Sequence, residues 1–327
     1  MKLVMTLCVK NEADIVRENI EFHLNAGVDF IIATDNCSDD ATESILKEYE
    51  RAGVLRYLFA PSPFLDQAKL VTKMARMAYL EYDADWVINN DADEFWWTPD
   101  GNLKATIQRY CDRETTDALY VNRVDFVSDS QNESQDLPFY QYMTQRKLES
   151  LNSLLKPLPP KLMHRADPKV KVGVGNHNAN GKLITHKVVA QDSEIVIFHF
   201  PLRSYQQLVR KATKDYQARL KNISFGRADS TYAEYHRLYN EGQLMAYYES
   251  YCSNKEDSVV SDFRFTESMK KIMNTPLIRK TSLVYADNTV GQKLKKRFLM
   301  NASLLSEYIS FSLKKCLYQL RLRLNRS

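Results

Sequence analysis

The chain has 327 residues, of which 44% are hydrophobic and 26% are charged, with only 9 Gly and 10 Pro. This composition supports a sizeable buried core and excludes collagen-like chains, linker arrays and bulk disorder. The net charge of +4 is uneven, because residues 279–327 carry a net charge of +9 and the preceding residues a net charge of −5. The sequence has no run of about 18 apolar residues, which would predict a membrane-spanning helix.

Five cysteines are scattered along the chain, and no two of them form a Cys-x-x-Cys motif. The pattern predicts neither a disulfide framework nor a zinc site and favours a reducing compartment. The first ten residues are mostly apolar and lead into polar residues without a small-residue cleavage site, which indicates a buried first strand rather than a signal peptide. We therefore expect a cytoplasmic protein. Peripheral contact with the inner face of the membrane is an alternative that would depend on the basic tail.

Short apolar runs alternate with amphipathic stretches in the first part of the chain. The pattern predicts strands at 2–9, 28–34, 54–59 and 85–90, and between them helices at 12–25, 41–51 and 65–81. Continuous apolar strands that alternate with helices are typical of a mostly parallel sheet covered on both faces. Ligands of such sheets bind beyond the carboxyl ends of the strands, where this chain has polar residues at 10–12, 35–36 and 91–93.

In the rest of the chain, the pattern of strands alternating with helices is less regular. Strands are expected at 118–127, 169–174, 182–189 and 194–200, with a functional-looking Gly-Val-Gly-Asn-His-Asn turn at 173–178 and a helix at 204–221. The remaining residues are mostly helical in pattern. We expect an α/β catalytic core over residues 1–221 and a helical extension over 222–327 that ends in a basic tail.

A buried strand leads directly into Asp91-Ala92-Asp93-Glu94-Phe95. Asp91 and Asp93 are two residues apart, so an extended backbone projects both carboxylates to the same side. Two such charges repel each other unless a cation lies between them, and oxygen ligands suit Mg²⁺ or Mn²⁺ shared with a substrate diphosphate. A solvated acidic turn is the alternative, because the Asp-x-Asp pattern by itself is common.

Three motifs in this order resemble the glycosyltransferase family 2-like proteins of GT-A fold, in the branch with an Asp-x-Asp-Glu-Phe motif. They are Cys8-Val9-Lys10-Asn11-Glu12, the stretch 34–42 (Thr-Asp-Asn-Cys-Ser-Asp-Asp-Ala-Thr), and Asp91-Ala92-Asp93-Glu94-Phe95. The stretches 161–165, 175–178 and 198–201, together with Lys211, continue the resemblance more weakly. It implies a GT-A α/β fold and a metal-dependent transferase that uses a nucleotide sugar.

The resemblance also implies roles for individual residues. Asn11, Glu12, Asp35 and Asp91 would contact the nucleotide sugar, and Asp91, Asp93 and His199 would ligate Mn²⁺ or Mg²⁺. Lys69 is a further candidate for phosphate contact, although lysines on helices are usually solvated. Ala41 stands where the family has glycine. The family's catalytic base has no match, so the base is unassigned; Asp125 and His177 are candidates that a structural role explains equally well.

The resemblance therefore implies transfer of a sugar from a nucleotide donor to a carbohydrate or lipid-linked acceptor. It further implies a UDP-linked donor and inversion at the transferred carbon. A sugar nucleotidyltransferase is one alternative, but Lys10-Asn11-Glu12 lacks its Gly-rich basic loop. A non-catalytic module that binds a sugar or a partner on a transferase scaffold is the other. Nucleic-acid binding is not expected, because no nucleic-acid-binding motif accompanies the positive charge.

Aromatic and basic residues leave two further questions open. Trp96 and Trp97 could stack on a sugar or pack in the core, and the tyrosines between 232 and 251 could fill a helical core or line an acceptor groove. The tail at 301–327 alternates apolar with basic residues. Such a helix could lie on an anionic membrane surface or pack against the core.

Overall fold

The computed structural model describes residues 1–60, 67–128, 137–151, 156–220, 230–252, 258–274 and 276. The chain divides into two compact units, Met1–Leu283 and Val284–Ser327, and every described residue belongs to the first unit. The basic tail at 301–327 lies outside the described residues, so its membrane contact stays a prediction. In the described part of the chain, no helix is both long and apolar enough to cross a membrane.

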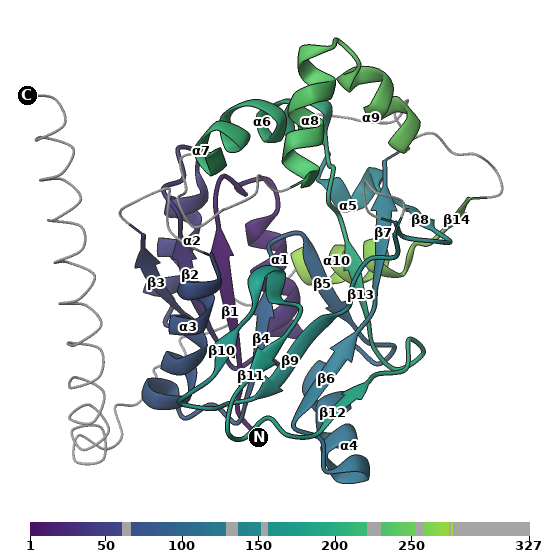
Figure 1. Ribbon diagram of the computed structural model, residues 1–327. Coiled ribbons are helices and arrows are strands. Elements are labelled where there is room, and N and C mark those ends of the chain that lie inside the picture. The colour runs from purple at the N-terminus through teal and green to yellow at the C-terminus, as the bar shows by residue number, and fades with distance from the viewer. Residues whose placement is uncertain are drawn as a thin grey trace, which may run out of the picture. The chain divides into compact units, whose positions relative to one another are not determined.

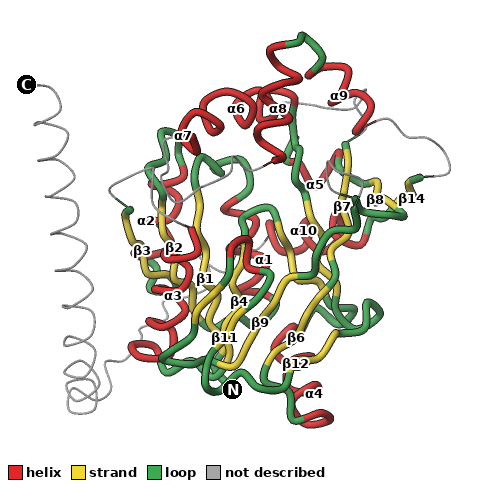
Figure 2. The backbone as a smooth tube through the Cα atoms, viewed as in Figure 1, coloured by secondary structure: helices red, strands yellow, loops and turns green. Residues whose placement is uncertain are grey.

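Seven strands form the central sheet, in the order β12-β6-β9-β4-β1-β2-β3 (Figures 1 and 2). Their bounds are β1 Leu3–Val9, β2 Phe30–Asp35, β3 Leu55–Phe59, β4 Trp86–Asn90, β6 Ala118–Val121, β9 Lys161–Arg165 and β12 Lys187–Val189. Strands β4, β1, β2 and β3 are parallel neighbours, whereas β9 runs antiparallel between β4 and β6. The prediction of a mostly parallel α/β sheet is confirmed.

The central sheet is apolar on both faces because helices cover both of them. The helices are α1 Val16–Asn25, α2 Thr42–Arg51, α3 Gln67–Tyr82 and α4 Leu103–Glu114. Along β1, Met5 lies in one buried cluster with Ile20 of α1, while its neighbour Val4 lies in a second cluster with Val71 of α3. Successive strand residues point to opposite faces, which explains the continuous apolar run of β1.

A second, five-stranded sheet has the order β14-β8-β7-β13-β5. Its strands are β5 Glu94–Trp97, β7 Arg123–Val127, β8 Gln145–Lys147, β13 Val196–His199 and β14 Val259–Ser261. The single strand predicted at 118–127 is wrong, because β6 joins the central sheet and β7 joins the second sheet. Both halves are largely buried, so the apolar pattern does not reveal where the chain passes from one sheet to the other.

Short elements complete the described part of the fold. They are α5 Phe139–Tyr142, the two-stranded ribbon of β10 Lys171–Val172 and β11 Ala179–Asn180, and the 3₁₀ turn Val174–Asn176. The turn carries positive φ angles at two successive residues, 68° at Gly175 and 61° at Asn176. Since a non-glycine residue rarely adopts such a φ angle, the turn is held by its surroundings, and Asn176 is buried there.

The described part of the predicted helical extension is helical except for one short strand, and it packs on the core. Its helices are α8 Ser230–Asn240, α9 Leu244–Cys252 and α10 Arg264–Asn274. The helix predicted just before it, at 204–221, is divided into α6 Tyr205–Arg210, a π-helical turn Lys211–Asp215 and α7 Tyr216–Leu220. Helices α6, α8 and α9 share a buried cluster that includes Leu208, Tyr235 and Tyr248. Strand β14, which the sequence did not predict, pairs with β8. The boundary expected at residue 221 stays a prediction.

His23 gives the buried core a pH dependence. Its ring is fully buried; Nδ1 donates a hydrogen bond to the Asn19 carbonyl at 2.8 Å, and Nε2 accepts one from the Trp96 backbone N–H at 3.3 Å. Burial lowers the pKa of His23 from 6.5 to about 4, although the hydrogen bond to Asn19 opposes the shift. The unfolded chain therefore binds the proton first, so the stability that neutral His23 contributes is present above pH 6.5 and is lost as the pH falls toward 4.

We expect His23→Gln to reduce the loss of stability on acidification. Between pH 7 and pH 4.5 the free energy of unfolding of the wild type should fall by about 2 kcal/mol more than that of the variant, since one pKa unit corresponds to about 1.4 kcal/mol. Urea denaturation at the two pH values measures the difference. His186→Gln is the matched control, because His186 is exposed. An equal loss in His23→Gln and the wild type would contradict the prediction.

Candidate active site

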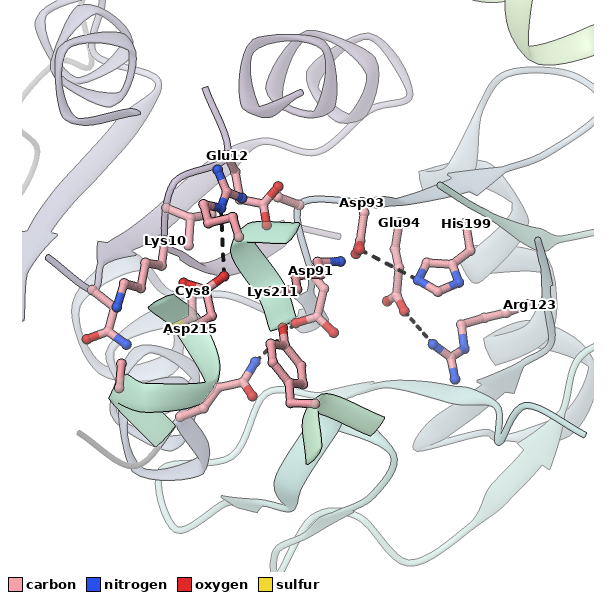
Figure 3. Close-up of a pocket in the computed structure, with 17 residues that line it drawn as sticks. Cys8, Lys10, Glu12, Asp91, Asp93, Glu94, Arg123, His199, Lys211 and Asp215 are labelled. Carbon is pink, nitrogen blue, oxygen red and sulfur yellow. Dashed lines mark hydrogen bonds and ion pairs between the residues drawn. The ribbon is translucent and has the colours of Figure 1, made fainter. Parts of the chain in front are cut away.

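A cavity of about 300 Å³ lies beyond the carboxyl ends of β1 and β4 (Figure 3). Its acidic side chains are Glu12, Asp91, Asp93, Glu94 and Asp215. Its basic side chains are Lys10, Arg123, Arg210 and Lys211, with His199 beside Asp93. The cavity therefore collects both signs of charge at the edge of the parallel sheet where the sequence predicted a ligand.

Asp93 and His199 face each other in this cavity. The register of β13 places His199 directly opposite Glu94 of β5 on one side and Asp125 of β7 on the other. Asp93 Oδ2 lies 3.7 Å from His199 Nε2, and His199 Nδ1 lies 2.7 Å from Asp125 Oδ1. Asp125 thus fixes the imidazole ring and leaves its other nitrogen toward Asp93.

The two carboxylates stabilise a charged imidazole between them. Burial by itself would lower the pKa of His199, but Asp125 and Asp93 outweigh it and raise this pKa to about 9. Burial would likewise raise the pKa of Asp93, yet His199, Lys211 and Arg203 bring it well below its usual range. Asp93 is therefore an ionised carboxylate in a nearly closed environment.

Asp91 differs from Asp93 because protein donors already occupy both of its oxygens. Lys161 Nζ donates to Oδ2 at 2.5 Å, while Asn176 Nδ2 and Gln67 Nε2 donate to Oδ1 at 3.1 and 3.2 Å. The donors come from β9, from the turn at 174–176 and from α3. A cation could bind Asp91 only by displacing one of them, so its predicted metal role finds less support in the geometry than that of Asp93.

The metal that the resemblance implies can be tested against this donor set. In the ranges that the structure describes, no three His, Cys, Asp or Glu side chains are grouped to hold a metal. Mg²⁺ usually takes only one or two carboxylates and completes its coordination with waters and substrate phosphates. Asp93 and His199 would fit that arrangement once the imidazole gives up the proton that it shares with Asp93, since a histidine binds a metal only in its neutral form. The Asp125 hydrogen bond to Nδ1 is the support that metal-binding histidines typically have.

Glu94 belongs to a buried network of charges beside the cavity. Its Oε1 lies 3.0 Å from Arg123 Nη1 and 3.0 Å from Lys161 Nζ, and all three side chains are less than a tenth exposed. Among the described residues, nothing donates to its other oxygen, Oε2, although that atom is buried. Figure 3 shows Glu94 beside Asp93, with Arg123 on its far side.

Arg203 joins the segment after β13 to the residues that precede α1. The guanidinium is 1% exposed and pairs with Glu12 at 2.6 Å and with Asp14 at 2.7 Å; it also donates to the Phe200 carbonyl at 3.1 Å. Burial raises the pKa of Glu12 to about 7, a shift that Arg203 opposes. Arg203 thus compensates a carboxylate that lines the cavity.

The structure brings some of the predicted site residues together and separates others. Glu12, Asp91, Asp93 and His199 line the cavity, whereas Asn11, Asp35, Lys69, Asp125 and His177 do not. Asn11 and Asp35 instead organise the neighbouring loops: Asn11 Oδ1 accepts from the Asp39 backbone N–H, and Asp35 Oδ1 accepts from Ser38. Lys69 is exposed on α3, where Gln67 reaches the cavity in its place.

The two candidates for the catalytic base have structural partners. Asp125 accepts from His199 through Oδ1 and from the Tyr251 hydroxyl through Oδ2, so it orients His199 and links it to α9. His177 donates from Nδ1 to the Pro160 carbonyl at 2.9 Å. Burial lowers the pKa of His177 to about 4. Neither residue reaches the cavity, and their catalytic role stays an untested prediction.

Of the two tryptophans after the acidic motif, Trp96 packs in the core and the partly buried Trp97 packs against it. Trp96 is fully buried and donates from Nε1 to Asn90 Oδ1 at 2.9 Å, while Trp97 stacks on Phe198 with 5.3 Å between ring centroids. Neither lines the cavity. Of the tyrosines after residue 230, Tyr232 lines the cavity, whereas Tyr235 and Tyr248 are buried.

Sequence reasoning missed the roles of Arg123, Lys161, Arg203 and Glu94. Arg123 and Lys161 each begin a strand and stand directly before apolar residues, and a basic residue at that position is a usable indication of a buried ion pair. Glu94 belongs to the acidic motif, but nothing in the motif pattern indicates a separate role for it. Arg203 carries no local pattern, because its partners lie 189 and 191 residues earlier.

The comparisons with solved structures give low similarity. S. aureus TarS 1-349 in complex with UDP-GlcNAc is 13% identical, with a TM-score of 0.42, over 75% of this chain and 79% of that chain. The longer S. aureus TarS has 14% identity and a TM-score of 0.41, and the match covers 70% of this chain and 44% of that chain. Glucosyl-3-phosphoglycerate synthase from Mycobacterium tuberculosis, in complex with Mg²⁺ and UDP, has 15% identity and a TM-score of 0.26 over 37% and 43%.

The comparison with protein families is decisive. No curated protein matches the chain, but the family described as glycosyltransferase family 92 matches residues 4–228, which is more than half of the sequence. The match includes every residue that lines the cavity except Tyr232. The motif resemblance therefore pointed to the right kind of enzyme, a glycosyltransferase, but named family 2-like proteins. The chain belongs to glycosyltransferase family 92.

Proposed function

We propose that this glycosyltransferase uses a nucleotide-sugar donor, UDP-linked, together with Mn²⁺ or Mg²⁺. The sugar would be transferred to a hydroxyl of a carbohydrate or lipid-linked acceptor, with inversion at the transferred carbon. The observation that carries the proposal is the pair of Asp93 and His199, 3.7 Å apart in a charged cavity at the carboxyl ends of β1 and β4. Ligands of parallel sheets bind at this edge.

The residues of the cavity divide the work of such a transfer. Asp93 and His199 would hold the cation, and Asp125 keeps the His199 ring in place through its 2.7 Å hydrogen bond. When bound, the cation neutralises the negative charge that develops on the diphosphate leaving group. Lys10 and Lys211 line the same cavity and add positive charge for the phosphates. Stabilising this charge as it develops lowers the activation barrier, because the interaction is stronger in the transition state than in the ground state.

We expect the purified protein to hydrolyse a UDP-sugar slowly in the presence of Mn²⁺ and to lose this activity in EDTA. UDP-, GDP-, dTDP- and CMP-sugars are compared by the release of free nucleotide, with water replacing the missing acceptor. Restoration by Mn²⁺ or Mg²⁺ after EDTA confirms the cation. Full activity in EDTA would contradict the cation, release from GDP-, dTDP- or CMP-sugars alone would contradict UDP, and nucleotide binding without any turnover would contradict catalysis.

A further inference from the structure

Glu94 presents one unpaired carboxylate oxygen beside the cavity. The side chain is 1% exposed and lines the cavity, and no described residue donates to Oε2. A buried oxygen that forms no hydrogen bond costs about 1–3 kcal/mol, and more when it is charged. Folded proteins rarely leave such atoms unpaired, so the position of Oε2 indicates a ligand donor.

The rest of the network fixes where this oxygen lies. Arg123 and Lys161 both contact Oε1, each at 3.0 Å. Arg123 is itself held by two further hydrogen bonds to the Pro159 carbonyl, and Lys161 by its ion pair with Asp91. Two anchored cations on one oxygen hold the carboxylate in place and leave Oε2 as its only oxygen without a donor among the described residues.

We propose that Glu94 Oε2 accepts a hydrogen bond from a hydroxyl group of the substrate sugar and so determines which sugar is used. An acceptor-only oxygen requires an O–H or N–H donor, and hydroxyls are the abundant donors of a hexose. The inference rests on the proposed function. We assign the hydroxyl to the hexose of the nucleotide sugar rather than to the acceptor. Glu94 directly follows Asp93, and Asp93 would hold the cation on the diphosphate to which this hexose is bonded.

A site of this kind discriminates strongly. When a substrate lacks the hydroxyl that a buried polar group is placed to bind, the group stays unpaired and the analogue is rejected. For a hydrogen bond to a charged group we expect the wild type to use one deoxy sugar roughly 10- to 100-fold less well than its parent, measured as kcat/KM. In Glu94→Ala this ratio should approach 1, because the partner of the hydroxyl is gone.

The experiment uses UDP-glucose and its 2-, 3-, 4- and 6-deoxy analogues, or the same series of UDP-galactose if the wild type hydrolyses only that donor. Hydrolysis is measured for the wild type, Glu94→Ala, Glu94→Gln and Glu194→Ala. Each ratio of parent to analogue is taken within one variant, so it does not depend on the fraction that is folded. Glu194 is the matched control, since it is also an ion-paired carboxylate, bound to Arg113, but lies outside the cavity.

The outcomes separate the proposals. A deoxy penalty that disappears in Glu94→Ala and persists in Glu194→Ala supports a hydroxyl of the donor sugar. If hydrolysis shows no deoxy penalty, transfer to methyl glucoside and to its deoxy analogues is measured instead. A penalty for one deoxy acceptor that disappears in Glu94→Ala would show that Oε2 binds a hydroxyl of the acceptor sugar. Penalties unchanged in Glu94→Ala, or absent in both series, overturn the inference. A wild type that hydrolyses no nucleotide sugar contradicts the proposed function itself.

Discussion

Asp93→Asn is expected to lower turnover by about 10³-fold or more while the protein stays folded. The substitution keeps the shape of the side chain but removes the charge that would hold the cation opposite His199. Loss of a cation that neutralises the leaving group removes several kcal/mol of transition-state stabilisation. The release of free nucleotide measures turnover, and calorimetric titration with Mn²⁺ measures binding of the cation. The melting curve checks that the variant is folded.

Asp91→Asn is the informative comparison for Asp93→Asn, because both changes are nearly isosteric and only two residues apart. Asp91 is occupied by donors from Lys161, Asn176 and Gln67. We therefore expect Asp91→Asn to retain Mn²⁺ binding that Asp93→Asn loses. Wild-type Mn²⁺ affinity in Asp93→Asn would exclude its role as a ligand. Equal losses in the two variants would restore the joint metal role predicted from the sequence.

The second large effect is expected for stability, at Arg203. Arg203→Met should lower the free energy of unfolding by about 3–5 kcal/mol, the usual cost of removing one partner from a buried ion pair. Glu12 and Asp14 would both lose their cation, and the pKa of Glu12, which burial already raises to about 7, would rise further. Methionine retains much of the apolar volume, so the loss reports mainly on the charge. Urea denaturation at pH 7 measures it.

Arg237→Met provides the control for Arg203→Met. Arg237 also contacts two carboxylates, those of Glu234 and Glu241, but half of its side chain is exposed on α8. Ion pairs on the surface contribute about 0–1 kcal/mol, so this variant should unfold at nearly the same urea concentration as the wild type. Similar stability losses at Arg203 and Arg237 would show that burial does not distinguish the two clusters.

The parallel half of the fold could be predicted from the sequence because its determinants are local. Apolar runs such as Leu3–Val9 alternate with helical patterns, and this alternation alone implies strands covered on both faces. The same reasoning located the ligand edge, since polar residues follow the strand ends. It therefore identified Asp93 as a site residue with no knowledge of its neighbours.

The tertiary structure decided the residues that surround Asp93. His199 reaches it only because β13 pairs with β5 and β7 in one particular register, opposite both Glu94 and Asp125. Strand pairing between distant segments is set by packing across the whole sheet, and a shift of one residue would turn every side chain to the other face. No local pattern encodes such a register.

What the sequence by itself determined is therefore the order of strands and helices in the parallel half, the acidic motif at a strand end and the glycosyltransferase character of the chain. The structure alone decided that Trp96 packs in the core, that Asp91 is held by Lys161 and that Glu94 is left with one unpaired oxygen. The physical reason is that periodicity reports which face of an element is buried. Hydrogen-bond and ion-pair partners, in contrast, depend on which distant elements meet there.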